Sequence, residues 1–359
     1  MKLKFARDDF AQDGLSSPDA ESLARQRYSE WHHFTFSDDR AGLSGIVNLA
    51  LSGDIRDPDR GRAAVSLIVH EDAHRWSGTM NVYGVEEARF VPGAIDLAIG
   101  PNAVRFDGTA YTVTAELKDR SVALDARWTP RAEAARIENM GGFINTFIVP
   151  RLDVDGSVRV AGRSIELHGA NGYHDHNWGA WDWNRDLGWN WGYLLDSSAD
   201  VPRDRQTAIV FGQITDATRA SARTELVLLL WRGAQLTHIF LDDAVSLEAL
   251  GRLAIDVPRV PGVMALFAPG RVGTIPERLS IDALDGADIL RIDCRVRDAI
   301  QFLIPHPAGS THTHVAELVG EYTVRGVIDG EAIAFTRGAF AELAGAGRTM
   351  HLPRVGIGV

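Results

Sequence analysis

Short runs of apolar or alternating residues recur along the whole chain and predict a protein built mainly from β-strands. A period of two places every second side chain on the same face of a strand, so one face can enter a core. In the first half these runs cover 43–51, 63–69, 110–117, 121–127, 157–160 and 164–168. In the second half they cover 207–214, 225–231, 237–241, 289–296, 315–319 and 322–328. The runs do not alternate with long helical patterns, so a parallel βαβ sheet is not expected.

Turn and helix patterns agree with this picture. Asp-Gly pairs predict hairpin turns, because glycine accepts the positive φ that tight turns need. They occur at 107–108, 155–156, 285–286 and 329–330. Helical patterns are few and cover 17–27, 130–138 and 247–253. Many antiparallel strands over 359 residues favour two barrels or sandwiches, which limit exposed sheet edges. The predicted fold class is all-β with few short helices.

Composition excludes several classes of partner. The chain has 37 basic and 48 acidic residues, and a net charge of −11 argues against nucleic acid. Its first nine residues lack the apolar centre of a signal peptide. The longest strongly apolar run, 226–231, is too short to cross a bilayer. The single cysteine, Cys294, excludes an internal disulfide and is expected to be a buried structural thiol. We expect a soluble, cytoplasmic protein that contacts a membrane surface transiently at most, and the sequence leaves its oligomeric state open.

The segment 172–179 carries the densest chemistry of the chain. Between two glycines it holds six side chains that accept, donate or stack: Tyr173, His174, Asp175, His176, Asn177 and Trp178. Asp and Asn are disfavoured in ordinary strands, so the segment is expected to supply an acid or base in an apolar setting. If it is extended, His174, His176 and Trp178 share one face, and Tyr173, Asp175 and Asn177 share the other. The alternation does not decide which face meets a ligand.

Tryptophans cluster directly after this segment. Five of the nine lie between positions 178 and 191. A pocket that combines aromatic rings with a few polar groups suits a large apolar ligand, and indole faces attract a developing cation. The alternative is a Trp-rich core or domain interface. Asp182 lies between two tryptophans and is a reserve acid. Trp189 and Trp191 share a face, and would lie beside His174 and His176 if the two strands formed a pair.

Histidine pairs also raise the question of a metal. His174 and His176, like His312 and His314, are spaced to share one face of a strand. No Glu follows the first pair, and the second, although followed by Glu317, is expected in a surface loop after 305–310. Phosphate-binding fingerprints and the Gly-x-Ser-x-Gly nucleophile motif do not occur. No metal, nucleotide or flavin cofactor is therefore expected.

Several motifs together resemble the carotenoid 1,2-hydratase (hydroxyneurosporene synthase) superfamily. They are Glu-Trp-His-His-Phe at 30–34, the segment 172–179, Trp-Asn-Trp-Gly at 189–192 and a closing strand at 337–342. The early motif departs from the family at His32 and His33, where Trp and Tyr are usual. The resemblance implies two lipocalin-like (calycin-type) antiparallel β domains with an apolar pocket at or near their junction. We expect the domains to cover 1–182 and 183–359.

The resemblance also implies an enzyme that needs no cofactor and acts on a hydrophobic small molecule, a polyene or isoprenoid. Hydration of a C=C bond needs a positioned acid, an environment that tolerates a cation, and a base that directs water. Asp175 is the expected acid, because burial among aromatic rings would keep it protonated, and His174 or His176 would orient water. Residues expected to line the pocket are Glu30, Trp31, Tyr173, Asn177, Trp178, Asp182, Trp189 and Trp191.

Two alternatives use the same pocket. Similar proteins include lipocalin-like cyclases of the Diels-Alderase type, which close a polyene by an intramolecular [4+2] reaction. Such a closure needs a folded substrate and a hydrogen-bond donor, which His174, Asn177 or Tyr173 could supply. The second alternative is a carrier that holds an apolar ligand without chemistry. The polar density at 173–177 argues against the carrier.

Overall fold

The fold was analysed in a computed structural model that describes residues 4–6, 26–71, 74–183, 185–198, 200–219, 222–261, 274–305 and 311–348. Strands dominate these ranges, and helix is limited there to single turns such as η2 (Val85–Glu87) and η3 (Asp242–Ala244). The all-β prediction is confirmed, with two antiparallel sheets curled into a barrel and a half-barrel. No helix in the described ranges is long and apolar enough to span a membrane.

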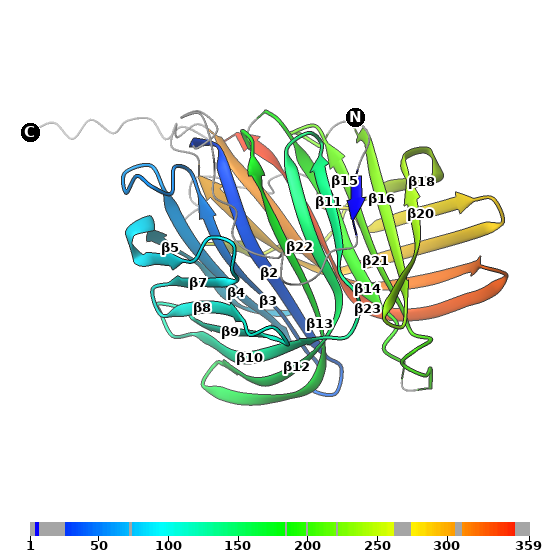
Figure 1. Ribbon diagram of the computed structural model, residues 1–359, viewed down its shortest axis with the longest axis horizontal. Coiled ribbons are helices and arrows are strands. Elements are labelled where there is room, and N and C mark those ends of the chain that lie inside the picture. The colour runs from blue at the N-terminus through cyan, green and yellow to red at the C-terminus, as the bar shows by residue number, and fades with distance from the viewer. Residues whose placement is uncertain are drawn as a thin grey trace, which may run out of the picture. The chain divides into compact units, whose positions relative to one another are not determined.

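The first sheet contains thirteen strands, and its main path runs β5-β4-β3-β2-β13-β12-β10-β9-β8-β7-β6. Its first members are β1 (Lys4–Ala6), β2 (Tyr28–Asp38), β3 (Leu43–Ser52), β4 (Arg62–Glu71), β5 (Arg75–Gly84), β6 (Ala88–Phe90) and β7 (Asp96–Ile99). The others are β8 (Asn102–Phe106), β9 (Tyr111–Glu116), β10 (Val122–Pro130), β11 (Ala135–Met140), β12 (Ile144–Val160) and β13 (Arg163–Ala180). In Figure 1, β2 (blue) lies beside β13 (green), with which it pairs.

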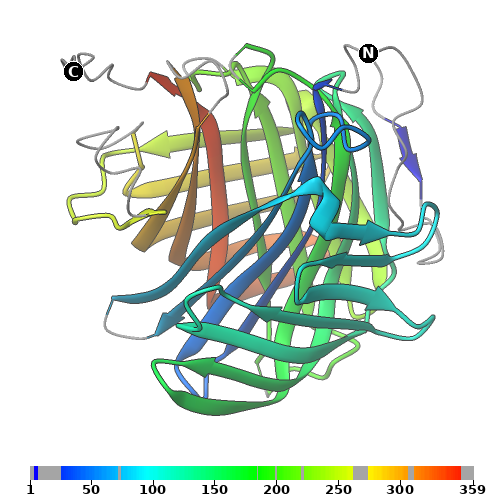
Figure 2. The same ribbon diagram turned by 90° about the vertical axis from the view of Figure 1, so that its left-hand side faces the viewer.

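The second sheet contains ten strands, and its main path runs β17-β16-β15-β14-β23-β22-β21-β20-β18. Its members are β14 (Gly188–Leu195), β15 (Thr207–Thr215), β16 (Ala222–Arg232), β17 (Gln235–Leu241), β18 (Val245–Leu250), β19 (Arg259–Val260), β20 (Arg278–Asp285), β21 (Asp288–Pro305), β22 (Thr311–Ile328) and β23 (Glu331–Arg348). The long hairpin of β22 and β23 is coloured orange to red in Figure 2. The short strand β19 pairs in parallel with β21.

The sequence located the strands better than the turns and helices. The two runs 315–319 and 322–328 merge into the single strand β22. The helices predicted at 130–138 and 247–253 are wrong: the first region ends β10 and contains most of β11, and the second contains most of β18. Pairing with neighbouring strands overrides a weak local helix preference there. Most of the helix predicted at 17–27 lies outside the described residues.

One predicted hairpin turn is also wrong. Asp155 and Gly156 do not turn the chain but lie inside β12, where the register with β13 shifts next to Gly156. Gly156 has a φ of 145° and packs closely on Ala126 of β10, which is the arrangement of a β-bulge. The turn between β12 and β13 is formed instead by Ala161 (φ 49°) and Gly162 (φ 77°).

Contacts divide the chain into two compact units. The N-terminal unit contains 1–181 together with 195–210 and 229–239, and the C-terminal unit contains 182–194, 211–228 and 240–359. The core of the N-terminal unit is lined by fully buried side chains such as Phe34, Tyr111 and Trp128. A domain boundary at 182/183 stays a prediction.

Candidate functional site

The polar segment 172–179 forms the second half of β13, between β2 and β12. Both glycines that bound it are required by close packing. A Cβ atom at Gly172 would lie 2.8 Å from the indole of Trp128, and one at Gly179 would lie 2.0 Å from the carbonyl oxygen of Phe143. The segment is extended, and its side chains alternate between the two faces of the strand as expected.

One face of this segment points into the apolar core of the N-terminal unit. His174 stacks on Phe34 with ring centroids 4.0 Å apart and lies 4.6 Å from the ring of Tyr111. Its Nδ1 donates a hydrogen bond of 2.9 Å to the carbonyl oxygen of His33. His174 is fully buried. Packing and a hydrogen bond to the backbone hold this imidazole.

His176 lies on the same core-facing side and pairs with Glu30. Its Nε2 is 2.7 Å from Oε1 of Glu30, and both side chains are fully buried. The ring of His32 stacks on His176, with centroids 4.2 Å apart, and Trp178 lies on the other side at 4.7 Å. Glu30 is thus a buried partner of His176, and Trp178 is packed against the same core.

The opposite face carries a hydrogen-bonded carboxyl group. The hydroxyl of Tyr173 donates to Oδ2 of Asp175 at 2.6 Å, and the amide of Asn177 donates to Oδ1. His33 is the register partner of Asp175 on β2. Burial, and then the charge of His174, lower the pKa of His33 from 6.5 to about 3, so this imidazole is neutral at physiological pH. Asp175 is therefore an acceptor of two hydrogen bonds beside a neutral histidine.

The three residues predicted to form one catalytic centre do not lie together in the structure. Asp175 lies on one face of β13, whereas His174 and His176 lie on the other, so the three side chains do not converge on one point. Trp31 packs edge-on against Trp181 on the Asp175 side of β2, with centroids 5.7 Å apart.

Asp182 is a turn residue. Its carboxylate lies 3.0 Å from Nε of Arg185, and its backbone N–H binds the carboxylate of Asp186. These local contacts explain why an aspartate stands at this position. Its two tryptophan neighbours in the sequence are not needed for that explanation.

Trp189 and Trp191 share a strand face, as predicted, but their strand is not a neighbour of the segment 172–179. β13 belongs to the first sheet, whereas β14 belongs to the second, where it lies beside β23. The condition under which these tryptophans would lie beside His174 and His176, a pairing of the two strands, is therefore not met. The register partner of Trp191 is Glu342, and the register partner of Glu342 on β22 is Glu317.

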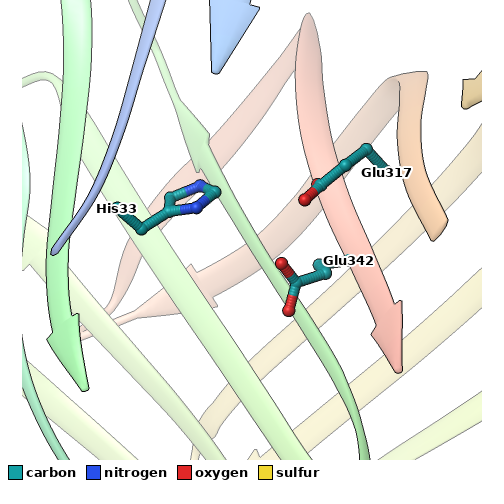
Figure 3. Close-up of side chains that lie close together, drawn as sticks. All are labelled: His33, Glu317 and Glu342. Atoms are coloured by element: carbon teal, nitrogen blue, oxygen red, sulfur yellow. The ribbon is translucent and has the colours of Figure 1, made fainter. Parts of the chain in front are cut away.

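Glu317 and Glu342 form a carboxyl pair in the C-terminal unit, and Figure 3 shows both side chains on their neighbouring strands. Carboxylate oxygens of the two groups lie within 4.8 Å of each other. The indole N–H of Trp189 donates a hydrogen bond to Oε1 of Glu342. Burial raises the pKa of Glu342 above its ordinary 4.5, while the hydrogen bonds from Glu317 and Trp189 oppose this effect. The pair therefore retains a proton at a pH where isolated glutamates have lost it.

Aromatic and apolar side chains surround this pair on the same face. Tyr193 and Phe340 are register partners and stack with centroids 6.4 Å apart. Ile300 is the register partner of Glu317 on β21 and is fully buried. This face combines indole, phenol and aliphatic groups with two carboxyls, the composition expected of a site for an apolar molecule.

This carboxyl pair was not among the site residues predicted from the sequence. Each glutamate stands between an alanine and a leucine, within an identical Ala-Glu-Leu tripeptide at 316–318 and 341–343. A carboxylate between apolar neighbours was the feature of the sequence that could have indicated the site, because such a group is costly to bury without a partner. The pairing itself depends on the register of β22 and β23.

His312 and His314 were expected in a surface loop, and this expectation is wrong. Both lie in β22 and are buried, at 0% and 4% exposure. Their ring centroids are 6.4 Å apart. β22 begins at Thr311, directly after the segment whose sequence predicts a loop. Both histidines pair with residues of β23 and are therefore part of the sheet.

Neither a family model nor a curated protein matches this sequence. Among solved structures, a protein from Nitrosomonas europaea provisionally assigned as AttH matches with a TM-score of 0.62 and 14% identity, over 89% of this chain and 92% of the other. Kievitone hydratase from Nectria haematococca matches with a TM-score of 0.56 and 11% identity, over 92% and 96%. CghA in complex with Sch210972 matches with a TM-score of 0.51 and 11% identity, over 95% and 98%. The motif-based resemblance is thus confirmed at the level of the fold.

Proposed function

We propose that this protein is a cofactor-independent enzyme that adds water to a C=C bond of a hydrophobic polyene or isoprenoid. The observation that carries the proposal is the pair of the buried Glu317 and the half-buried Glu342 on an aromatic face. Protonation of an alkene needs an acid that keeps its proton near neutral pH, and burial of Glu342 acts in that direction. Glu342 therefore replaces Asp175 as the leading candidate for the acid.

The reaction follows from a carboxyl pair that shares one proton. The protonated member gives its proton to the less substituted alkene carbon, and the π electrons form the new C–H bond. A tertiary cation remains, next to the indoles of Trp189 and Trp191, whose π faces attract positive charge. Water attacks the cation, and the ionised carboxylate takes the proton that water loses. Transfer of this proton between Glu317 and Glu342 restores the pair, so the net change is the addition of one water molecule.

The shared fold is compatible with this chemistry. Kievitone hydratase has the same architecture over nearly its whole length, so the fold accommodates an enzyme that adds water. At 11% identity the comparison carries no residue assignment. The assignment to Glu317 and Glu342 rests on the burial of Glu317, on the register of the two strands and on the donor Trp189 beside Glu342.

The hydrogen-bonded group around Asp175 is the second candidate centre. Two donors on its carboxyl oxygens suit a carboxylate that orients or deprotonates water better than an acid that protonates carbon. Tyr173 and Asn177 direct their donors to Asp175, which argues against their use on a substrate carbonyl in a cyclase. A cyclisation or a carrier function would proceed without a transferable proton.

A test uses lycopene in detergent micelles as an acyclic isoprenoid and water labelled with heavy oxygen. Mass spectrometry should detect a labelled hydroxyl group in the product. Glu342→Gln and Glu317→Gln should each lower the rate by about 10²–10⁴-fold, the usual contribution of a positioned acid or base. The matched control is Glu321→Gln, which removes a more exposed carboxylate from the same strand and should leave the rate unchanged.

Asp175→Asn separates the two candidate centres. If Glu342→Gln retains full activity while Asp175→Asn abolishes it, the carboxyl pair is not the acid. If lycopene is not hydrated, apolar compounds extracted from the purified protein should be identified by mass spectrometry and assayed in the same way. Cyclisation of such a compound without label, at equal rates in wild type and Glu342→Gln, would contradict the hydratase proposal.

A further inference from the structure

A second polar group of the C-terminal unit lies on the face of β22 and β23 opposite the carboxyl pair. His314 is three residues from Glu317 along β22, so their side chains point to opposite sides of the sheet. The register partner of His314 on β23 is Gly345. The side chain of Arg219, from the turn between β15 and β16, crosses this glycine: a Cβ atom at position 345 would lie 3.1 Å from its Cγ and Cδ.

Among the described residues, the hydrogen-bond partners of the Arg219 side chain are neutral. Its Nη2 donates to Oδ1 of Asn190 at 3.1 Å, and its Nη1 lies 3.4 Å from the carbonyl oxygen of Thr274. Its Nε is buried and has no hydrogen-bond partner among the described residues. Asn190 is held in turn by Gln213, because its Nδ2 donates to Oε1 of Gln213 at 2.7 Å. The guanidinium is therefore positioned by amides and packing.

No carboxylate neutralises this guanidinium among the described ion pairs. Burial lowers the pKa of Arg219 from 12.5 to about 10, and no acidic group opposes this shift. The segments 217–224, 261–276 and 301–316 contain neither Asp nor Glu. The carboxylate of Asp216, three residues before Arg219, accepts hydrogen bonds from Thr218 instead. A cation that is removed from water is costly unless an anion or several acceptors compensate it.

His314 presents a second unsatisfied group. It is buried, and its Nδ1 has no hydrogen-bond partner in the described part of the chain. Burial lowers the pKa of His314 from 6.5 to about 4, and the charges of Arg219 and His312 act in the same direction. A neutral imidazole beside a guanidinium can donate a hydrogen bond to an oxyanion that the guanidinium also binds.

We propose that Arg219 and His314, with Asn190 as the group that positions Arg219, bind a compact oxyanion, the carboxylate or phosphate group of a small molecule. The anion supplies the counter-charge that Arg219 lacks and accepts a hydrogen bond from His314. This site lies on the other side of the sheet from Glu317 and Glu342, so it does not rest on the proposed hydratase activity.

The test is isothermal titration of the full-length protein at pH 7 with inorganic phosphate and, separately, with acetate. At least one anion should bind to the wild type. Arg219→Met, which keeps the aliphatic chain over Gly345, should weaken binding by about tenfold or more, the effect of losing a charge-assisted hydrogen bond. The matched control is Arg325→Met, which removes an exposed cation from β22 and should leave binding unchanged.

A second variant keeps the proposal falsifiable if Arg219→Met does not fold. His314→Gln removes the imidazole and should also weaken binding, with an unchanged circular dichroism spectrum. Binding of phosphate alone supports a phosphate ligand, and binding of acetate alone supports a carboxylate. The proposal is overturned if neither anion binds at concentrations up to about 10 mM, the range of weak specific sites, or if both variants bind as tightly as the wild type.

Discussion

Glu317 and Glu342 occupy facing positions on β22 and β23, and each stands between an alanine and a leucine in an identical Ala-Glu-Leu tripeptide. Neither carboxyl group would be stable there alone. Together they can share a proton, and the indole N–H of Trp189 adds a donor to Glu342. Such a pair is costly to bury and contains an acid and a base in contact, so it is better explained by chemistry than by stability.

The pair should make the protein less stable as the pH rises. The pKa of Glu342 is raised above 4.5 in the folded state, so the folded state holds a proton that the unfolded state releases. Its contribution to stability is present below pH 4.5 and is lost as the pH rises through the raised value. Glu342→Gln should remove this dependence. Urea unfolding at pH 4.5 and pH 9 measures it, and the variant should gain stability relative to the wild type only at the higher pH.

Glu321→Gln is the control for this measurement, because its carboxylate is 42% exposed and is paired with Arg297. It should change stability by about 0–1 kcal/mol, as expected for an exposed ion pair. An equal loss of stability for Glu342→Gln at both pH values would mean that the carboxyl pair does not retain a proton in the folded protein.

The strands of this fold could be predicted from the sequence because their alternation is local. The expected runs at 43–51 and 207–214 correspond closely to β3 and β15. Lengths and turns were less accurate, because they depend on partners: β12 continues through Asp155 and Gly156, with an unbroken register to β10 and a bulge in its pairing with β13. A local turn motif does not reveal that a neighbouring strand occupies the same place.

The candidate site was predicted only in part for the same reason. The segment 172–179 was selected correctly as a dense polar strand, but its faces could not be assigned without the core residues that pack on it. The structure places His174 against Phe34 and leaves Asp175 on the opposite side. The pairing of Glu317 with Glu342 requires knowledge of the register across β22 and β23 and was therefore outside the reach of sequence patterns.

His33 should make the folded protein more stable above pH 6.5 than in acid. Burial, and then the charge of His174, lower its pKa from 6.5 to about 3, so the unfolded state binds a proton that the folded state excludes. The stability that this provides is present above pH 6.5 and is lost as the pH falls toward 3. His33→Gln should reduce the slope of unfolding free energy against pH by up to about one proton in this window.

His70 offers a comparison, because it is also a buried histidine on a strand of the first sheet. His70→Gln should leave most of the acid dependence in place. The measurement is chemical denaturation at half-unit steps between pH 4 and pH 7. An unchanged slope in His33→Gln would show that His33 is already protonated in the folded protein.

Activity should persist after exhaustive treatment with a chelator and without added nucleotide or flavin. Two carboxylates within 4.8 Å could also hold a divalent cation, so this experiment distinguishes proton transfer from metal chemistry at the same residues. The proposed mechanism uses only the proton shared by Glu317 and Glu342. Elemental analysis of the purified protein accompanies the assay, and stoichiometric zinc or iron whose removal abolishes activity would contradict the prediction.

Trp191→Leu should lower turnover by about tenfold and leave the fold intact. Trp191 is half-buried and is the register partner of Glu342, so its indole lies on the face where the cation would form. Loss of a cation–π contact of one to two kcal/mol corresponds to about a tenfold change in rate. Circular dichroism and the labelled-water assay measure the two properties separately. An unchanged rate would remove this face from the reaction.

Cys294→Ala is the matched core variant for that experiment. Cys294 is buried, and a Cβ atom on Gly320 would lie 2.8 Å from its Sγ, so the thiol fills a tightly packed position. Burial raises the pKa of Cys294 to about 12, which keeps the thiol protonated and unreactive. The substitution should cost about 1 kcal/mol of stability through lost packing and leave turnover unchanged. Loss of turnover in Cys294→Ala comparable to that in Trp191→Leu would show that both variants act through the core of the C-terminal unit rather than through the indole.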